Sequence, residues 1–295
     1  MAGVTPEMIK HLRESTNAGM LDCKKALIES DGDISAAVEW LRKKGLSKAA
    51  KVADKVAAEG AIVLKVSDDF KSASIVEINC ETDFVAKNDH FKSFANDAIE
   101  RVRNGDFKTT DELRASLSDR ASEAIAKLGE KIDVRRFAKY SLTNGAINGY
   151  LHSNSRVGAI VAIETGAKLE EFARDIAMHA TAMKPLYLNA AEVPAEAIAK
   201  EREIAIEQLK KEGKPEAMLE KIAQGKINKF IQDNTLEGQT FVKDDKKSVA
   251  QALNDAAKAQ GASAKIVFFA RFEVGEGIEK KSNDFAAEVA AQTQR

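Results

Sequence analysis

Hydrophobic residues recur along the chain at two spacings, one typical of helices and one typical of strands. Residues 5–55 show the helical spacing in three short runs. Thr5 and Pro6 favour the start of a helix, and Asp31-Gly32-Asp33 is a turn sequence between the second run and the third. Gly45 is expected to end the third run. The pattern predicts a compact N-terminal bundle of three helices.

From residue 56 onward, strand-like and helical segments alternate, and one unit of strand, loop and helix occurs twice. The matching pieces are an apolar strand, a Glu-Thr pair and a Phe-Ala pair within a helix. They are residues 75–78, 81–82 and 94–95 in the first unit and residues 160–163, 164–165 and 172–173 in the second. We therefore expect a duplicated core of small antiparallel sheets with helices, which is an α+β fold.

Further segments complete the two units. In the first we expect strands at 61–66, 74–78 and 131–137 and helices at 89–103 and 111–128. In the second we expect strands near 147–150, 157–163 and 265–274 and helices at 169–183 and 249–260. Residues 193–232, with Pro194 and Pro215 at helix starts, predict an inserted antiparallel helical hairpin. Residues 284–292 predict a C-terminal helix.

The two units differ most at the connection between strand and helix. The Glu and Phe that bound it are 13 positions apart in the first unit and 8 in the second, so the first connection carries 5 more residues. The surplus falls on Asp83-Phe84-Val85-Ala86-Lys87. One interpretation is that Phe84 packs into the core and Asp83 caps the following turn. Because the second unit does without this extension, the other interpretation is favoured, in which the loop presents Phe84 and Asp83 to a partner.

Composition narrows the class of protein. The chain has 295 residues, 44% hydrophobic and 31% charged, as expected of a folded protein with about two domains. Its formal net charge of −1 argues against a sequence-independent grip on nucleic acid. Two cysteines, Cys23 and Cys80, imply neither a disulfide framework nor a zinc site. With no run of 18 apolar residues and no targeting segment, we expect a cytoplasmic protein without a membrane span.

Two features support alternative functions. An RNA-associated adaptor could use a basic run, although a run without interleaved aromatic residues is also typical of a solvated helix face. Its members are Arg42, Lys43, Lys44, Lys48, Lys51 and Lys55. An enzyme could use the carboxylates near the extension, which could also hold a divalent cation. They are Glu77, Glu81, Asp83 and Asp89, and the presence of Lys87 and Phe84 among them argues against a metal.

The four histidines are scattered and form no catalytic motif. His179 lies in an apolar helical segment and is expected to be a hydrogen-bonded core residue. His152 lies in a polar loop and is a better candidate for a surface contact. The Gly-x-Gly at residues 275–277 lacks the Lys and Ser/Thr of a phosphate loop. The sequence therefore predicts neither a metal nor a cofactor.

Two long motifs resemble the signatures of a known family. Residues 12–27, LRESTNAGMLDCKKAL, and residues 77–87, EINCETDFVAK, are similar to the two signatures of the elongation factor Ts family. A third match lies at residues 275–280, so the resemblance covers nearly the whole chain. One departure is Asn17, where Gly is commoner in the family; Asn tolerates positive φ, so the turn is expected to survive.

The resemblance implies an α+β protein with a UBA-like three-helix bundle at residues 1–55 that binds a GTPase. The duplicated core would comprise residues 56–144, with the extension that acts in exchange, and residues 145–280. The hairpin at 193–232 would be an antiparallel coiled coil that can mediate subunit contact, and residues 281–295 would form a C-terminal helical module.

The same resemblance implies a guanine nucleotide exchange factor for elongation factor Tu, without covalent chemistry. Thr82, Asp83, Phe84 and Val85 would displace the elements of the GTPase that position Mg²⁺ and so release GDP. Further contacts to the GTPase would come from Arg13, Met20, Leu21 and His152. The partner would be bound in its GDP-bound and nucleotide-free states until GTP enters, with no direct contact to nucleotide, nucleic acid or membrane.

Overall fold

The computed structural model describes residues 4–16 and 18–279, and the C-terminal module expected at 281–295 lies outside these residues. The chain begins with helices α1 (Pro6–Thr16), α2 (Met20–Glu29) and α3 (Ile34–Val52). Asp33 caps α3, because its carboxylate accepts a hydrogen bond from the N–H of Ala36 at 2.8 Å. The three helices enclose a small core made by Leu12, Cys23, Ala26, Leu27 and Ala37.

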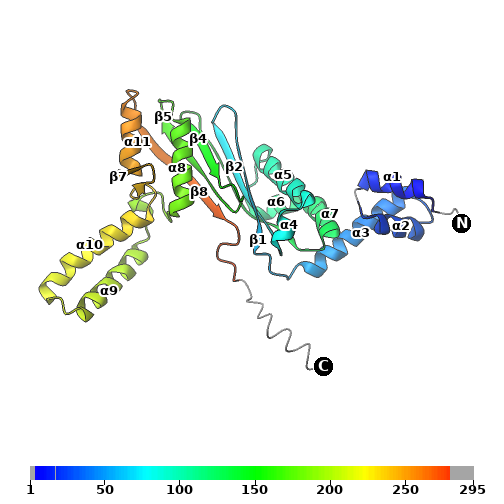
Figure 1. The fold of residues 1–295 in the computed structure, drawn as a ribbon, viewed down its shortest axis with the longest axis horizontal. Coiled ribbons are helices and arrows are strands. Elements are labelled where there is room, and N and C mark those ends of the chain that lie inside the picture. The colour runs from blue at the N-terminus through cyan, green and yellow to red at the C-terminus, as the bar shows by residue number, and fades with distance from the viewer. Residues whose placement is uncertain (1–3, 17, 280–295) are drawn as a thin grey trace.

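Helix α3 does not end at Gly45, so that prediction is wrong, and the helix continues to Val52. Gly45 is buried where α3 packs against α7 (Ser118–Leu128). A Cβ atom at this position would lie 3.3 Å from the carbonyl oxygen of Ser122. The glycine therefore permits the close approach of two helices. Through this contact α3 attaches the N-terminal bundle to one end of the core (Figure 1).

The first half of the core contains an antiparallel sheet in the order β1 (Glu59–Val66), β2 (Ser72–Cys80) and β3 (Ile132–Ser141). Between β2 and β3 lie α4 (Asp83–Ala86), α5 (Asp89–Asn104), α6 (Thr110–Ser116) and α7. The single helix expected at 111–128 is wrong, because the chain breaks at the buried residue Leu117. The break allows α6 to pack on β3 while α7 packs on α3 and α5.

The second half repeats this plan with strands β4 (Ala146–Leu151), β5 (Val157–Thr165) and β8 (Ala264–Glu273). Its helices are α8 (Glu170–Met183) and α11 (Val249–Lys258), and a short 3₁₀ turn spans Ala190–Glu192. Two further strands, β6 (Thr240–Phe241) and β7 (Asp244–Ser248), form a small separate sheet.

The two sheets lie between two layers of helices. Figure 1 shows α5, α6 and α7 on one side of the sheets and α8 and α11 on the other. Each helical layer shares an apolar core with the sheet that it covers. A third core joins the two sheets and includes Ile62, Ile75, Ile147 and Ile160. The central strands β2 and β5 are buried along nearly their whole length, which explains their almost continuous apolar sequences.

The strand register confirms that the two halves are copies of one unit. A bulge lies at the same point of each sheet: β3 has one extra residue, Arg135, opposite Glu77/Ile78 of β2, and β8 has one, Val267, opposite Ala162/Ile163 of β5. The Glu-Thr pairs matched in the sequence are not equivalent, because Glu164-Thr165 ends β5 whereas Glu81-Thr82 follows the end of β2. The first connection is nevertheless the longer one, as predicted: it spans residues 81–88, against 166–169 in the second unit.

The halves also exchange a matched pair of hydrogen bonds. The N–H of Ile62 donates to the carbonyl oxygen of Ser155 at 2.7 Å, and the N–H of Ile147 donates to that of Phe70 at 2.8 Å. Phe70 and Ser155 both have a φ of 55°. Because each half supplies the same donor and the same acceptor, the two units are related by an approximate two-fold rotation.

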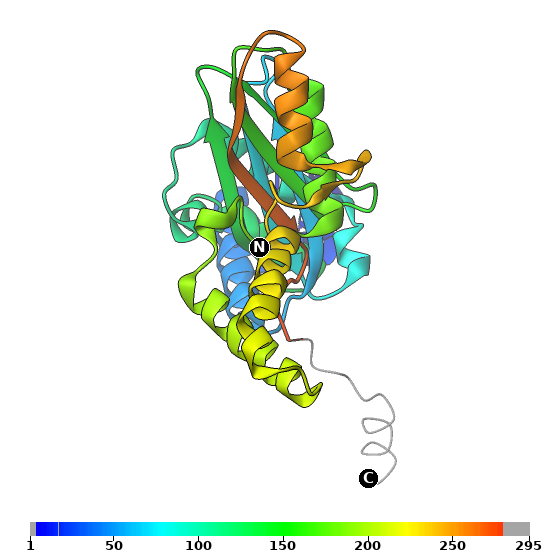
Figure 2. The same ribbon diagram turned by 90° about the vertical axis from the view of Figure 1, so that its left-hand side faces the viewer.

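The inserted hairpin consists of α9 (Ala195–Lys211) and α10 (Glu216–Asn234). Four buried residues pack between the two helices, so the apolar stripe has a core of its own; they are Ala205, Leu209, Leu219 and Ala223. Figure 2 shows the hairpin extending away from the sheets. Among the described residues, no helix combines the length and apolar character needed to cross a membrane.

Candidate functional site

Residues 81–88 form a loop around the one-turn helix α4, which we call the tip. The hydroxyl of Thr82 accepts a hydrogen bond from the N–H of Val85 at 3.3 Å, so Thr82, and not Asp83, is the N-cap of α4. Phe84 is 81% exposed. The interpretation in which Phe84 packs into the core is therefore wrong. The chain presents a large aromatic side chain to the surroundings on a capped turn.

Asp83 faces Lys87 across one helical turn. Lys87 Nζ donates a hydrogen bond to Asp83 Oδ2 at 2.7 Å, and this bond lowers the pKa of the Asp83 carboxyl. Asp83 therefore carries a negative charge at neutral pH. The pair lies in solvent, where such ion pairs are weak, so either charge can turn to a partner at small cost.

Two kinds of contact hold the tip to the core. Val85 and Ala86 pack against the apolar core of the first half. On the other side, the carboxylate of Glu130 accepts hydrogen bonds from the N–H groups of Glu81 and Thr82 and from the hydroxyl of Thr82. Sequence patterns did not single out Glu130, because it follows an ordinary helix-ending glycine and lies 48 residues from Thr82.

The three residues expected on the N-terminal bundle are all on its surface. Met20 and Leu21 begin α2 and are 58% and 82% exposed. Arg13 is exposed in the last turn of α1. They lie apart from the tip, since α3 separates the bundle from α4 (Figure 1). Two adjacent, exposed large apolar side chains, Met20 and Leu21, suit a contact with another protein.

His152 is exposed in the turn that joins β4 to β5. Arg156, in the same turn, pairs with Glu59 of β1. Glu59 lies opposite Cys80, the residue that precedes the tip. The turn that carries His152 therefore lies at the same end of the core as the tip.

Comparison with known proteins decides the family. A family model described as elongation factor TS matches residues 81–276. Elongation factor Ts of Nitratiruptor sp. is 52% identical to the chain, with 98% of this chain and 99% of that protein covered. Elongation factor Ts of Nautilia profundicola is 49% identical, and that of Clostridioides difficile is 46% identical, each over 99% of both chains. The chain belongs to the elongation factor Ts family. It is therefore a translation elongation factor, and its α+β fold is that of its family.

The carboxylates near the tip do not converge on one point in this member of the elongation factor Ts family. Glu77 is buried between the sheets and paired with two arginines. Glu81 is paired with Lys55, and Asp83 with Lys87. Within the described ranges, no three His, Cys, Asp or Glu side chains gather where they could bind a metal ion. The geometry therefore gives no support to an enzyme that works through these carboxylates.

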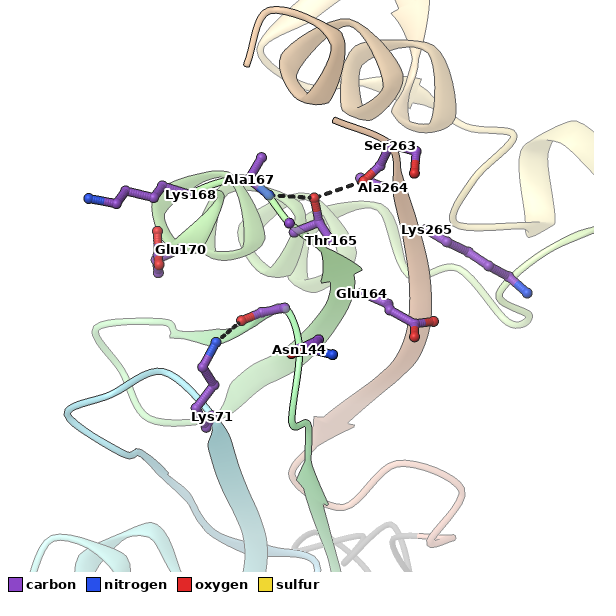
Figure 3. A pocket seen from close by; sticks show the side chains of 12 residues that line it. Lys71, Asn144, Glu164, Thr165, Ala167, Lys168, Glu170, Ser263, Ala264 and Lys265 are labelled. Atoms are coloured by element: carbon purple, nitrogen blue, oxygen red, sulfur yellow. Dashed lines mark hydrogen bonds between the residues drawn. The ribbon is translucent and has the colours of Figure 1, made fainter. Parts of the chain in front are cut away.

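The second unit has a hollow of about 770 Å³ beside the connection from β5 to α8. In Figure 3, Lys71 donates a hydrogen bond to the carbonyl oxygen of Gly145. The hydroxyl of Thr165 donates to the carbonyl oxygen of Ser263 at 2.8 Å. The side chain of Lys168 points away from the hollow. Lys71 and Thr165 thus serve the local fold. Within the described residues of this elongation factor Ts chain, the connection from β5 to α8 has no counterpart of the exposed Phe84.

The basic run of α3 and the residues after it is matched by acids. Five of its six members form ion pairs: Arg42 with Asp119, Lys43 with Glu39, Lys44 and Lys48 with Asp22, and Lys55 with Glu81. Because an acid lies against each of these five residues, the run does not form the uncompensated positive surface that phosphate groups require. The arrangement supports the interpretation of the run as a solvated helix face. It gives no support to an RNA-associated adaptor.

His179 is a hydrogen-bonded core residue, as predicted. Its Nε2 lies 3.0 Å from Gln239 Oε1, and its Nδ1 accepts a hydrogen bond from the N–H of Val242 at 3.2 Å. Burial lowers the pKa of the imidazole. Gln239 also donates to the carbonyl oxygens of Met183 and Asp233. The group therefore ties α8 to the base of the helical hairpin.

Proposed function

We propose that this chain binds elongation factor Tu in its GDP-bound state and accelerates the release of GDP. The observation that carries the proposal is Phe84, whose side chain is 81% exposed on a turn that is fixed at both ends. Exposed aromatic side chains on fixed supports are typical anchors of protein interfaces. Phe84 and Asp83 would enter between helices of the GTPase domain, with Thr82 and Val85 maintaining the shape of the tip.

Release of a tightly bound nucleotide requires the loss of its strongest contacts. Backbone amides, a lysine and Mg²⁺ hold the phosphates of a GTPase nucleotide. The tip would displace the elements that position Mg²⁺, while no atom of the factor touches the nucleotide. By linkage, the factor and GDP weaken each other's binding to elongation factor Tu by the same ratio. The factor remains bound to the nucleotide-free GTPase until GTP enters, and no covalent step is needed.

The surface of the N-terminal bundle would hold the same GTPase. Arg13, Met20 and Leu21 would supply this second attachment, with His152 as a further contact. Two attachments raise the effective concentration of the tip at its target. The proposal requires no nucleic acid or membrane, and the cytoplasm is the expected compartment. The helical hairpin is proposed as a contact surface in a higher-order complex.

The test is the release of a fluorescent GDP from elongation factor Tu at free Mg²⁺ near the physiological level. Wild type, Phe84→Ala and Leu186→Ala are compared at equal concentrations. Leu186 is a matched control because it is a large apolar residue, 65% exposed, that follows α8 in the other half of the core. We expect wild type and Leu186→Ala to accelerate release equally, and Phe84→Ala to lose about tenfold or more of that acceleration.

Each other result has a definite meaning. Equal acceleration by wild type and Phe84→Ala would place the exchange activity outside the tip. No acceleration by the wild type would refute the proposed function. Circular dichroism and thermal unfolding of both variants establish that a lower rate does not come from loss of the fold.

A further inference from the structure

The polar groups of Thr82 are held on several sides. Its N–H donates to Glu130 Oε2 at 3.0 Å, and its hydroxyl donates to Glu130 Oε1 at 2.6 Å. Its carbonyl oxygen accepts hydrogen bonds from the Cys80 thiol at 3.1 Å and from the N–H of Ala86 at 3.3 Å. One carboxylate thus accepts both donors of Thr82. With its proton directed at Glu130, the hydroxyl can offer a lone pair to the N–H of Val85.

Glu130 also lies near the buried thiol of Cys80 and disfavours its ionisation. Burial, together with the negative charges of Glu130 and Glu59, raises the pKa of Cys80 to about 12. The thiol therefore keeps its proton and serves as a donor to Thr82. Cys80 is fully buried, so this contact is closed to solvent.

Helix α4 depends on these contacts because it has only four residues. A single helical turn is unstable by itself, since nucleation costs more than one hydrogen bond returns. Its first N–H groups have no partners inside the helix and must be satisfied by a cap. The cap is the hydroxyl of Thr82, and the orientation of that hydroxyl is set by Glu130.

The loop that carries Glu130 is itself fixed to the tip. Gly129, with a φ of 77°, ends α7 and turns the chain toward β3. The N–H of Glu81 donates to Glu130 at 3.2 Å, and in return the N–H of Lys131 donates to the Glu81 carboxylate at 2.7 Å. Two adjacent loops therefore hold each other by an exchange of carboxylate and backbone contacts. This arrangement leaves Phe84 little freedom except in its own side chain.

We infer that Glu130 is a positioning residue for nucleotide exchange, which acts by holding Thr82 and α4 in the conformation that presents Phe84. The inference rests on the proposed function of the tip. Glu130 contacts the tip from behind and needs no contact with the GTPase. Its removal therefore lowers the rate at which a bound complex releases GDP more than it lowers the affinity of the complex.

The experiment measures GDP release over a range of factor concentrations, so that the maximal rate and the half-saturating concentration are separated. Glu130→Ala is expected to lower the maximal rate about tenfold, with less than about a threefold change in half-saturating concentration. Glu130→Gln keeps one acceptor for the backbone and is expected to lie between Glu130→Ala and wild type. Asp133→Ala is the matched control, because it removes a β3 carboxylate that binds Arg114 and not the tip.

A double variant tests whether Glu130 acts through Phe84. If Glu130 acts by presenting Phe84, then adding Glu130→Ala to Phe84→Ala lowers the maximal rate by less than about twofold. Thermal unfolding of each variant is measured in parallel. Asp133→Ala is expected to lower the unfolding midpoint without lowering the exchange rate, which separates positioning from general stability.

The outcomes distinguish the two proposals. Suppose that wild type accelerates GDP release from elongation factor Tu and Phe84→Ala does not. If folded Glu130→Ala then accelerates release as much as wild type, the positioning role is refuted and the proposed function stands. Losses that multiply in the double variant, or an equal loss in Asp133→Ala, also refute the positioning role. If wild type does not accelerate GDP release from elongation factor Tu, the proposed function is refuted, and so is the inference that rests on it.

Discussion

Among single residues, Glu77 joins parts of the chain that are far apart in sequence. It is fully buried and accepts hydrogen bonds from Arg135 at 3.0 Å and from Arg136 at 2.6 Å. It also accepts one from the N–H of Gly275 at 2.8 Å. Arg136 lies over the ring of Phe272, 4.5 Å from its centroid. Glu77 therefore connects β2, which leads into the tip, with the chain at and after the end of β8.

Loss of this carboxylate leaves the N–H of Gly275 without its acceptor and takes the buried counter-charge from two arginines, which keep their other polar contacts, to Glu273 and Glu276. We expect Glu77→Ala to lower the free energy of unfolding by about 3 kcal/mol, and Glu77→Gln to lower it less. Urea unfolding followed by circular dichroism measures the effect. Asp89→Ala is the control, because it breaks an exposed ion pair with Lys92 and is expected to leave the midpoint unchanged. A loss in Glu77→Ala no larger than in the control contradicts the prediction.

At the scale of helices and strands, hydrophobic spacing was sufficient to predict an element wherever that element buries one regular face. It failed where a tertiary contact decided the outcome, as at Gly45, which lies against α7, and at Leu117, where α6 and α7 separate. Strand β7 was not expected, since Asp244–Ser248 has no apolar alternation. The tip could be predicted as a functional loop because the connection is longer in the first unit than in the second. The role of Glu130 could not be predicted, because its partner Thr82 lies 48 residues away in sequence.

The free energy of unfolding is expected to fall in acid because of His179, which lies at the base of the helical hairpin. Burial lowers the pKa of His179 in the folded protein below the ordinary value of 6.5. As pH falls below 6.5, the unfolded chain takes up a proton that the folded chain resists, so stability present above 6.5 is lost by up to about 1.4 kcal/mol per pH unit. Unfolding measured between pH 7.5 and 5 tests this. His179→Gln is expected to show a shallower dependence, and identical slopes would contradict the assignment.

At the scale of the whole molecule, a core with approximate two-fold symmetry carries attachments that break the symmetry. The three-helix bundle and the tip belong to the first half, and the helical hairpin belongs to the second. The core between the sheets is continuous across both halves. A rigid centre of this kind can hold separate binding surfaces at constant distances, which the proposed two-point attachment to a GTPase requires.

Because the hairpin has its own core, it should be removable without loss of the rest. We expect the chain lacking residues 196–231, closed by a short Gly-Ser linker, to keep its unfolding midpoint within about 3 °C and to keep its exchange activity. Gel filtration with light scattering then compares the two chains over a range of concentrations. A larger species formed by the full chain alone supports contact through the hairpin, and the same assembly in both counts against it. Loss of exchange in the shortened chain would instead show that the hairpin takes part in holding the GTPase.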